Sequence, residues 1–296
     1  MIWKLPHREV RFPRRTLVMG IVNVNDDSFS GDGTLDVEEA LRHARRQAEA
    51  GADVIDVGAE SARTNREAVA VDEEVRRFAA FLRRWPEVAA EAMPRDGDQL
   101  WPPVVSANTW RPEVVEAVLP LGVELVNDMG GLPDDRNARL CASAGASLLI
   151  MHTVGEPKVS QLDRSWPDVM GAIERFFEKQ IHVAEKAGLA TERIVLDPGI
   201  DFAKQRDDNL RVFRELGRLQ RFGRPVLVPV GRKTVIGEVL DLPEPRDRDA
   251  GTLGCLSASV RRGAQIVRVH DVAAAWQAVK VLWGLESGGT SPLSRG

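Results

Sequence analysis

Side chains able to bind a small polar ligand recur at one kind of position in this chain, the end of an apolar run. Asp197 ends the apolar part of the run 193–199, Asn127 lies in the run 124–129, and Lys233 follows the run 225–231. An Asp and an Asn could pair with the edge of a flat heterocycle that carries an amino group beside a ring N–H, while the lysine could neutralise Asp197 or donate to a ring carbonyl. Alone, each is as readily a helix cap, a turn residue or a surface lysine. The whole set at or near the run ends is Asn23, Asp56, Glu60, Asn108, Asn127, His152, Asp197, Lys233, Arg268 and His270.

Arg268 and His270 form a second kind of site. They alternate on the last apolar run with Val269 between them, and the two-residue period of a strand puts both side chains on one side. Because a guanidinium suits phosphate oxygens, the pair predicts an anion site. The alternative is a structural ion pair of Arg268 with Asp271 or Asp249.

The runs that carry these residues have the composition of buried parallel strands, and helical patterns separate them, the first with Asp36 as its cap. The C-terminal ends of eight parallel strands in a barrel face one mouth. The pattern therefore predicts an α/β fold, a (β/α)8 TIM barrel with its active site at that mouth. A doubly wound open sheet is the alternative, because periodicity does not establish closure. The expected strands are 16–23, 52–58, 103–109, 124–129, 147–153, 193–199, 225–231 and 265–271, and the expected helices are 36–50, 72–85, 112–119, 134–144, 166–187, 207–222, 252–262 and 273–285.

Length and composition set the remaining expectations. The 296 residues suit one barrel domain, in which residues 1–15 form an extension closing the barrel bottom. The net charge of −4 indicates no nucleic acid partner, and no run approaches the roughly 20 apolar residues that span a bilayer. The start has no signal-peptide pattern, so a cytoplasmic location is expected. No Ser-His-Asp set, phosphate-binding Walker loop or zinc motif is present. The long connections 28–35 and 59–71 have the small polar residues of loops that close over a substrate.

Ordered motifs resemble those of one family. Residues 19–30 read MGIVNVNDDSFS and resemble the opening M-G-I-L-N-V-T-P-D-S-F-S of the dihydropteroate synthases. Residues 51–63, GADVIDVGAESAR, are similar to its G-A-D-I-I-D-V-G-G-E-S-T-R. Six later motifs follow in the same order, at 126–128, 151–152, 196–199, 202–204, 232–237 and 268–272. The resemblance covers nearly the whole chain.

The resemblance implies a TIM barrel that joins 4-aminobenzoate to (7,8-dihydropterin-6-yl)methyl diphosphate, giving dihydropteroate and diphosphate in folate biosynthesis. It also implies a homodimer, to which the wide apolar surface of the expected helix 273–285 would contribute. By the same resemblance, the pterin is held by Asn127, Asp197 and Lys233 with Asn108 beside them, the diphosphate by Arg63, Arg268 and His270 with Mg²⁺ near Asn23, and the aminobenzoate by Phe29, Phe202, Lys233 and Thr234.

Departures from the family pattern cluster on the catalytic side. Asn108 stands where the motif S-V-D-T has its Asp, and Ala62 and the Thr64-Asn65 pair change S-T-R-P-G. The remaining departures are Asn25 and Asp26 for T-P, Asp201 and Ala203 for glycines of G-x-G-F-G-K, and Gly231 for a serine. We therefore expect a synthase with weakened activity. The alternatives are a pterin-binding paralogue with another nucleophile or none, and a methyltetrahydrofolate–corrinoid methyltransferase. The methyltransferase alternative is disfavoured, because the residues expected to bind the diphosphate are retained.

Overall fold

The eight expected strands form one parallel sheet that closes on itself. The computed structural model describes residues 1–25, 33–61, 67–159, 161 and 164–286. The sheet order is β8-β7-β6-β5-β4-β3-β10-β9, and a parallel bridge between Leu196 and Val226 joins its two edges. The predicted TIM barrel is confirmed, and the open sheet is not adopted. The strands are β3 (Leu17–Asn23), β4 (Val54–Gly58), β5 (Val104–Asn108), β6 (Leu125–Asp128), β7 (Ser147–Met151), β8 (Ile194–Asp197), β9 (Leu227–Pro229) and β10 (Ile266–Val269).

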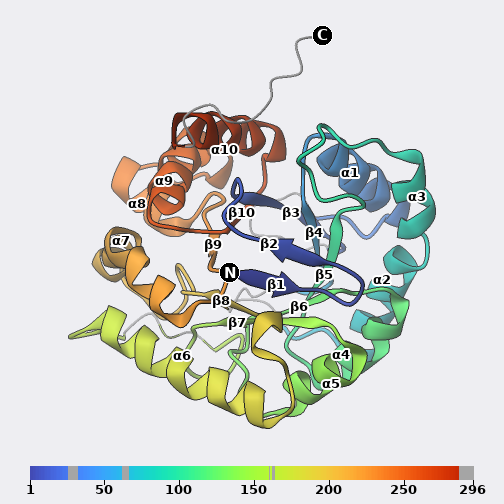
Figure 1. Cartoon of the computed structure of the whole chain (residues 1–296), viewed down its shortest axis with the longest axis horizontal. Coiled ribbons are helices and arrows are strands. Elements are labelled where there is room, and N and C mark those ends of the chain that lie inside the picture. Colours follow the sequence, from blue (N-terminus) through green and yellow to red (C-terminus); the bar gives the residue numbers. More distant parts are fainter. Residues whose placement is uncertain (26–32, 62–66, 160, 162–163, 287–296) are drawn as a thin grey trace.

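Helices surround the barrel in chain order, as Figure 1 shows. Asp36 caps the first of them by accepting the N–H groups of Glu38 and Glu39, as the sequence predicts. The helices are α1 (Val37–Glu49), α2 (Val71–Leu82), α3 (Trp85–Glu91), α4 (Pro112–Val118), α5 (Arg136–Ala144), α6 (Val169–Lys186), α7 (Arg206–Glu215), α8 (Thr234–Leu240), α9 (Asp249–Arg261) and α10 (Val272–Glu286). In the part of the chain that the structure describes, no helix is both long and apolar enough to cross a membrane.

The sequence prediction was wrong for three helical segments around the barrel. The helix expected over 207–222 is α-helical only to Glu215 and continues as a 3-10 helix over Leu216–Phe222, which contains Gly217, a poor helix former. The seven-residue helices α3 and α8 were not predicted, because a helical period cannot be distinguished over two turns.

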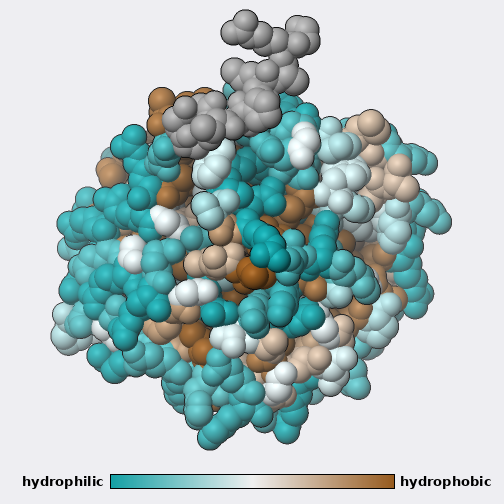
Figure 2. Space-filling view, in the orientation of Figure 1, coloured by the Kyte–Doolittle hydropathy of each residue, from teal (hydrophilic) through white to brown (hydrophobic). Residues whose placement is uncertain are grey.

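The N-terminal residues form a hairpin of β1 (Ile2–Lys4) and β2 (Glu9–Arg11). Figure 1 shows it lying across one end of the barrel. Trp3, Leu5 and Val10 are buried against the N-terminal residues of the barrel strands, and the Trp3 indole donates to Ser147 Oγ at 3.0 Å. The outer side of this face is mostly hydrophilic (Figure 2). The polar strand ends therefore lie at the opposite, C-terminal end of the barrel.

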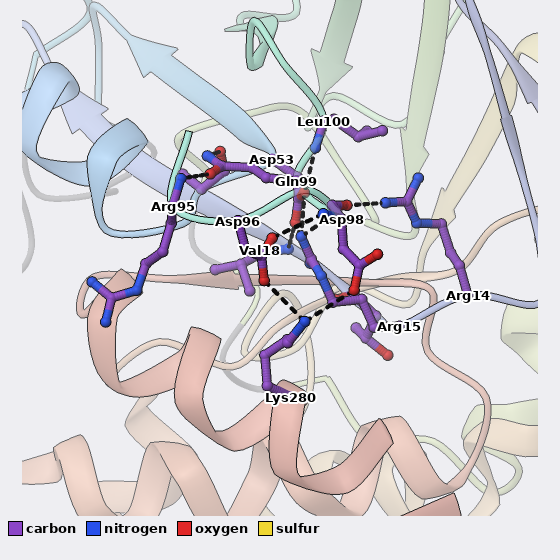
Figure 3. A network of polar contacts seen from close by, with 12 residues as sticks. Arg14, Arg15, Val18, Asp53, Arg95, Asp96, Asp98, Gln99, Leu100 and Lys280 are labelled. Carbon is purple, nitrogen blue, oxygen red and sulfur yellow. Dashed lines mark hydrogen bonds and ion pairs between the residues drawn. The ribbon is translucent and has the colours of Figure 1, made fainter. Parts of the chain in front are cut away.

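A charge network with a buried ion pair at its centre also lies at the N-terminal end (Figure 3). Arg15 binds both oxygens of Asp53, at 2.7 and 2.9 Å, and neither side chain is more than 1% exposed. Asp53 also accepts the N–H groups of Val18 and Leu100. Lys280 of α10 pairs with Asp96 and Asp98 in the segment before β5. This network joins distant segments, and its position away from the mouth is typical of a stabilising role.

Candidate active site at the mouth of the barrel

Asp56 on β4 is the centre of the polar mouth. Its carboxylate is fully buried and accepts hydrogen bonds from Ser106 Oγ at 2.5 Å, Asn127 Nδ2 at 3.1 Å and Asn108 Nδ2 at 3.4 Å. Arg268 Nε of β10 lies 2.7 Å from Asp56 Oδ2 and forms an ion pair with it. Three strands, β5, β6 and β10, thus direct side chains at this one carboxylate of β4. The sequence grouped Asp56 with the strand ends but assigned it no role, although a carboxylate within an apolar strand requires partners.

Strand register places three asparagines in one row. Asn23 pairs with Gly58, Gly58 with Asn108, and Asn108 with Asn127 along β3, β4, β5 and β6. A Cβ added at Gly58 would lie 3.6 Å from Asn23 Oδ1 and 3.8 Å from Asn108 Cβ, so the two asparagines approach each other across the glycine. Lateral neighbours in a sheet point to the same side, and the row therefore faces the mouth together.

One acceptor in this row has no partner. Asn108 is 8% exposed, and its Oδ1 is buried without a hydrogen bond from any residue that the structure describes. Leaving such an acceptor unsatisfied costs about 1–3 kcal/mol. A ligand with an N–H group directed at Asn108 would satisfy it.

Asp197, at the end of β8, is the second buried carboxylate of the mouth. Its Oδ1 accepts the Gly199 N–H at 2.7 Å. Burial raises the pKa of Asp197 to about 6, although the positive charges of Lys233, Lys204 and Arg268 act in the opposite direction. The carboxylate is therefore ionised at neutral pH but close to its titration range.

Lys233 lies beside Asp197 and Phe202 and is only partly exposed. Its Nζ donates to the Ile200 carbonyl at 3.1 Å and lies 5.3 Å from the centre of the Phe202 ring. Desolvation lowers the pKa of this ammonium, against the attraction of Asp201 and Asp197. Thr234 follows it as the exposed first residue of α8. The expected aminobenzoate residues Phe202, Lys233 and Thr234 are thus close together, whereas Phe29 lies outside the described residues.

Of the expected diphosphate residues, Arg268 and His270 are partly exposed at the end of β10. The alternative ion pair of Arg268 with Asp249 or Asp271 is not seen among the described residues: Arg268 pairs with Asp56, Asp249 binds Arg232, and Asp271 accepts the Ala274 N–H. A Cβ at Gly231 would come within 3.0 Å of His270 Cδ2, so a serine there would require His270 to shift. Arg63, the third expected diphosphate residue, lies outside the described residues.

Lys204 and His152 support the mouth from behind Asp197. Lys204 Nζ donates to the carbonyls of Gly199 (2.8 Å) and Phe202 (3.0 Å), and lies 2.9 Å from His152 Nδ1. Burial lowers the pKa of Lys204 to about 7 and that of His152 to about 2, so the imidazole is neutral and can accept from the ammonium. The sequence matched both residues to family motifs without a role. Their geometry indicates that they shape the 199–204 turn.

Glu60, just beyond β4, belongs to a separate cluster. Its carboxylate binds Arg111, and Lys158 Nζ contacts Glu60 Oε1 at 3.0 Å. Lys158 also donates to the carbonyls of Ser61 (3.3 Å) and Glu67 (3.0 Å). The cluster therefore fixes both ends of the 61–67 segment. Within the ranges that the structure describes, no three His, Cys, Asp or Glu side chains are grouped so that they could hold a metal ion.

Comparison with known proteins agrees with this geometry. Residues 19–270 match the model of the family described as pterin binding enzyme. Dihydropteroate synthase of Synechocystis is 36% identical over 275 residues, which cover 91% of each chain. The Yersinia pestis dihydropteroate synthase, solved in a sulfonamide drug complex, superimposes with a TM-score of 0.87 at 32% identity over 97% of this chain and all of that one. The Xanthomonas albilineans enzyme, solved with 4-aminobenzoic acid, gives 0.83 at 33% identity, over 97% of this chain and 99% of that one. With this barrel, this mouth and these relatives, the chain belongs to the dihydropteroate synthase family of pterin binding enzymes.

Proposed function

We propose that this chain is a dihydropteroate synthase, a transferase of folate biosynthesis that condenses (7,8-dihydropterin-6-yl)methyl diphosphate with 4-aminobenzoate. The products are 7,8-dihydropteroate and diphosphate. The observation that carries this proposal is the mouth itself, where buried Asp197, the unsatisfied Asn108 oxygen and the Asp56–Arg268 pair meet. The relative solved with 4-aminobenzoic acid supports the second substrate.

The pterin would lie among Asp197, Asn127, Lys233 and Asn108. An ionised Asp197 can accept two N–H bonds from the amino group and ring nitrogen of a pterin, and Lys233 can donate to its ring carbonyl. The free Oδ1 of Asn108 offers a further acceptor. These contacts would fix the ring so that its methylene carbon faces the β10 side of the mouth.

The diphosphate would be held by Arg268, His270 and Arg63. Mg²⁺ bound with a diphosphate needs only one or two protein ligands, and the amide oxygen of Asn23, near Asn108 in the row, suits it. When bound, Mg²⁺ neutralises charge on the leaving oxygens. Arg268 and His270 would add hydrogen-bond donors to the same oxygens.

Reaction would begin as the bond between the methylene carbon and the diphosphate oxygen breaks, its electron pair leaving with diphosphate. The pterin ring delocalises the resulting cation. The arylamine nitrogen then forms the new C–N bond and loses its proton to solvent. Because an arylamine is only weakly basic, its position against the methylene matters more than general-base help.

A diphosphate-release assay with the pterin diphosphate, with and without 4-aminobenzoate, tests the proposal. Release that depends on 4-aminobenzoate and is matched by dihydropteroate formation is expected. Pterin binding without product would indicate a binding protein that lacks synthase activity.

Replacing Asp197 with asparagine is expected to weaken pterin binding by at least about 1–3 kcal/mol, because an NH2 group replaces one of the two oxygens that would accept from the N–H groups of the ring. Wild-type affinity should fall as the pH is lowered from 7 to 5, since protonation of Asp197 near its pKa of about 6 also converts one acceptor oxygen into a donor. Calorimetry with a pterin measures both effects. The variant should be no less stable than the wild type at pH 7. A carboxyl whose pKa is raised on folding destabilises the folded protein as the pH rises through that pKa, and asparagine carries no such charge.

Asp128 provides a matched control for Asp197. It ends β6, is fully buried, and burial likewise raises its pKa to about 6. Its carboxylate instead accepts from Gly130 N–H and Asn137 Nδ2, away from the Asp56 cluster. Asp128→Asn should leave pterin affinity and its pH dependence unchanged. Equal losses in the two variants would show that the effect at Asp197 is not local to a pterin site.

A homodimer through the α8 and α10 side of the barrel is part of the proposal. Val239 and Leu240 of α8 are 47% and 48% exposed, and Val281 and Leu285 of α10 are 62% and 70% exposed. Hydrophobic residues show at the α8–α10 edge in Figure 2. Apolar surface of this kind favours association.

Light scattering at micromolar concentration should therefore give the mass of a dimer. Val281→Asp should shift the mass toward that of the monomer. Met93→Asp, at a 72% exposed apolar residue before β5, should leave it unchanged. A monomeric wild-type protein would contradict the proposed assembly.

A further inference from the structure

Asp201 occupies a backbone position that suits glycine. Its φ is +67°, in the left-handed region that side chains other than Asn and Asp rarely adopt, and the family pattern has glycine there. Asn209 of α7 holds the residue in place: its Oδ1 accepts the Asp201 N–H at 2.9 Å, and its Nδ2 donates to Asp201 Oδ1 at 3.2 Å. The acidic side chain is therefore a fixed part of this turn.

The Asp201 carboxylate binds the segment that carries Lys233. Its Oδ2 accepts the Thr234 N–H at 2.6 Å, and its Oδ1 accepts the Val235 N–H at 3.2 Å. Burial lowers the pKa of Lys233, and the negative charge of Asp201 is the largest effect that raises it again. The turn after β8 and the turn after β9 are thus joined by one negative charge.

This charge lies in the wall of the expected arylamine site. Phe202 is the next residue along the chain, and Lys233 Nζ lies 5.3 Å from the centre of its ring. The Thr234 N–H donates a hydrogen bond to the Asp201 carboxylate. These are three of the four residues expected to contact 4-aminobenzoate. Glycine at position 201 would place no charge there.

We propose that Asp201 determines the charge preference of the arylamine site. Its carboxylate repels the carboxylate of 4-aminobenzoate. It also accepts the Thr234 and Val235 N–H groups and offsets the charge of Lys233, which would otherwise attract that substrate. This chain therefore favours uncharged arylamines more than a glycine-containing relative does. The inference rests on the proposed synthase function. Like charges within several ångströms at a partly solvated site change affinity by roughly ten-fold.

The test compares 4-aminobenzoate with 4-aminobenzamide, which differ in charge and little in shape, in the wild type and Asp201→Asn. Asparagine keeps one of the two acceptor oxygens and tolerates the left-handed backbone conformation, so the turn should be retained. The ratio of kcat/KM for the benzoate to that for the benzamide should rise about ten-fold in the variant. The change should come from a lower KM for the benzoate, with the KM for the benzamide and for the pterin diphosphate unchanged. Asp201→Gly should shift the ratio in the same direction.

Asp207→Asn, which removes a charge from the exposed side of α7, is the control and should leave the ratio unchanged. A ratio that does not move in Asp201→Asn, or KM values that change together for both amines, would overturn the inference and leave Asp201 with a purely structural role. Calorimetric binding of both amines, with diphosphate and an unreactive pterin present, gives the same ratio without turnover. No product with either amine in any of these proteins would count against the proposed function alone, since the binding ratio still decides the role of Asp201.

Discussion

Replacement of Asp56 with asparagine is expected to lower kcat/KM by more than about a hundred-fold and to destabilise the fold by about 3 kcal/mol. The carboxylate is fully buried, and Arg268, its ion-pair partner, has a side chain that is 20% exposed. Breaking a buried pair leaves one charge without compensation and costs about 3–5 kcal/mol; the partial exposure of Arg268 sets the lower end of that range. Displacement of Asn127 and Arg268 would misplace both ends of the pterin diphosphate.

Denaturant unfolding and steady-state kinetics measure the two effects. Ser106→Ala is the matched variant, because it removes one hydrogen bond to Asp56 and keeps the charge pair. It should cost about 1 kcal/mol of stability and little activity. If Asp56→Asn retained nearly all of its activity, Asp56 would not organise the site.

The second large effect is expected from Asn108→Asp, which should raise synthase activity. A carboxylate about 4 Å from the cationic methylene contributes up to ~4 kcal/mol at an effective dielectric near 20, or about three powers of ten in rate. The gain should be partial, because Asn108 Nδ2 now donates to Asp56 Oδ2 at 3.4 Å and a second carboxylate would be repelled there. Like-charge repulsion raises the pKa of the new carboxyl, so the gain should grow as the pH rises through that pKa.

Kinetics of the wild type and Asn108→Asp between pH 6 and 9 would measure this gain. Asn127→Asp is the control, since it also places a carboxylate beside Asp56 but removes an amide expected to hold the pterin. It should lower activity at every pH. A wild type as fast as ordinary synthases, with no gain in Asn108→Asp, would show that the missing charge is compensated elsewhere. Weakened activity in the wild type stays a prediction until then.

The sequence alone determined the alternation of strands and helices and the placement of polar residues at the strand ends. Near-continuous apolar runs separated by helical periods specify buried parallel strands with crossovers, and all eight strands lie within a few residues of the predicted ranges. Helix starts were also predictable from local sequence, as the Asp36 cap of α1 and Pro112 at the start of α4 show. The polar strand ends were predictable because every parallel strand of a barrel ends at the same face.

Only the tertiary structure decided which charged side chains pair with one another. Arg268 could have bound Asp249 or Asp271 nearby in sequence, yet it pairs with Asp56, 212 residues away. Likewise, the sequence identifies Asp201 only as a departure from a family glycine, whereas the structure shows its carboxylate accepting the first N–H groups of α8. Sequence periodicity specifies which face of a strand is buried, but not its neighbour's register or where the sheet closes. Those depend on barrel closure and side-chain packing, and they determine which buried charges meet.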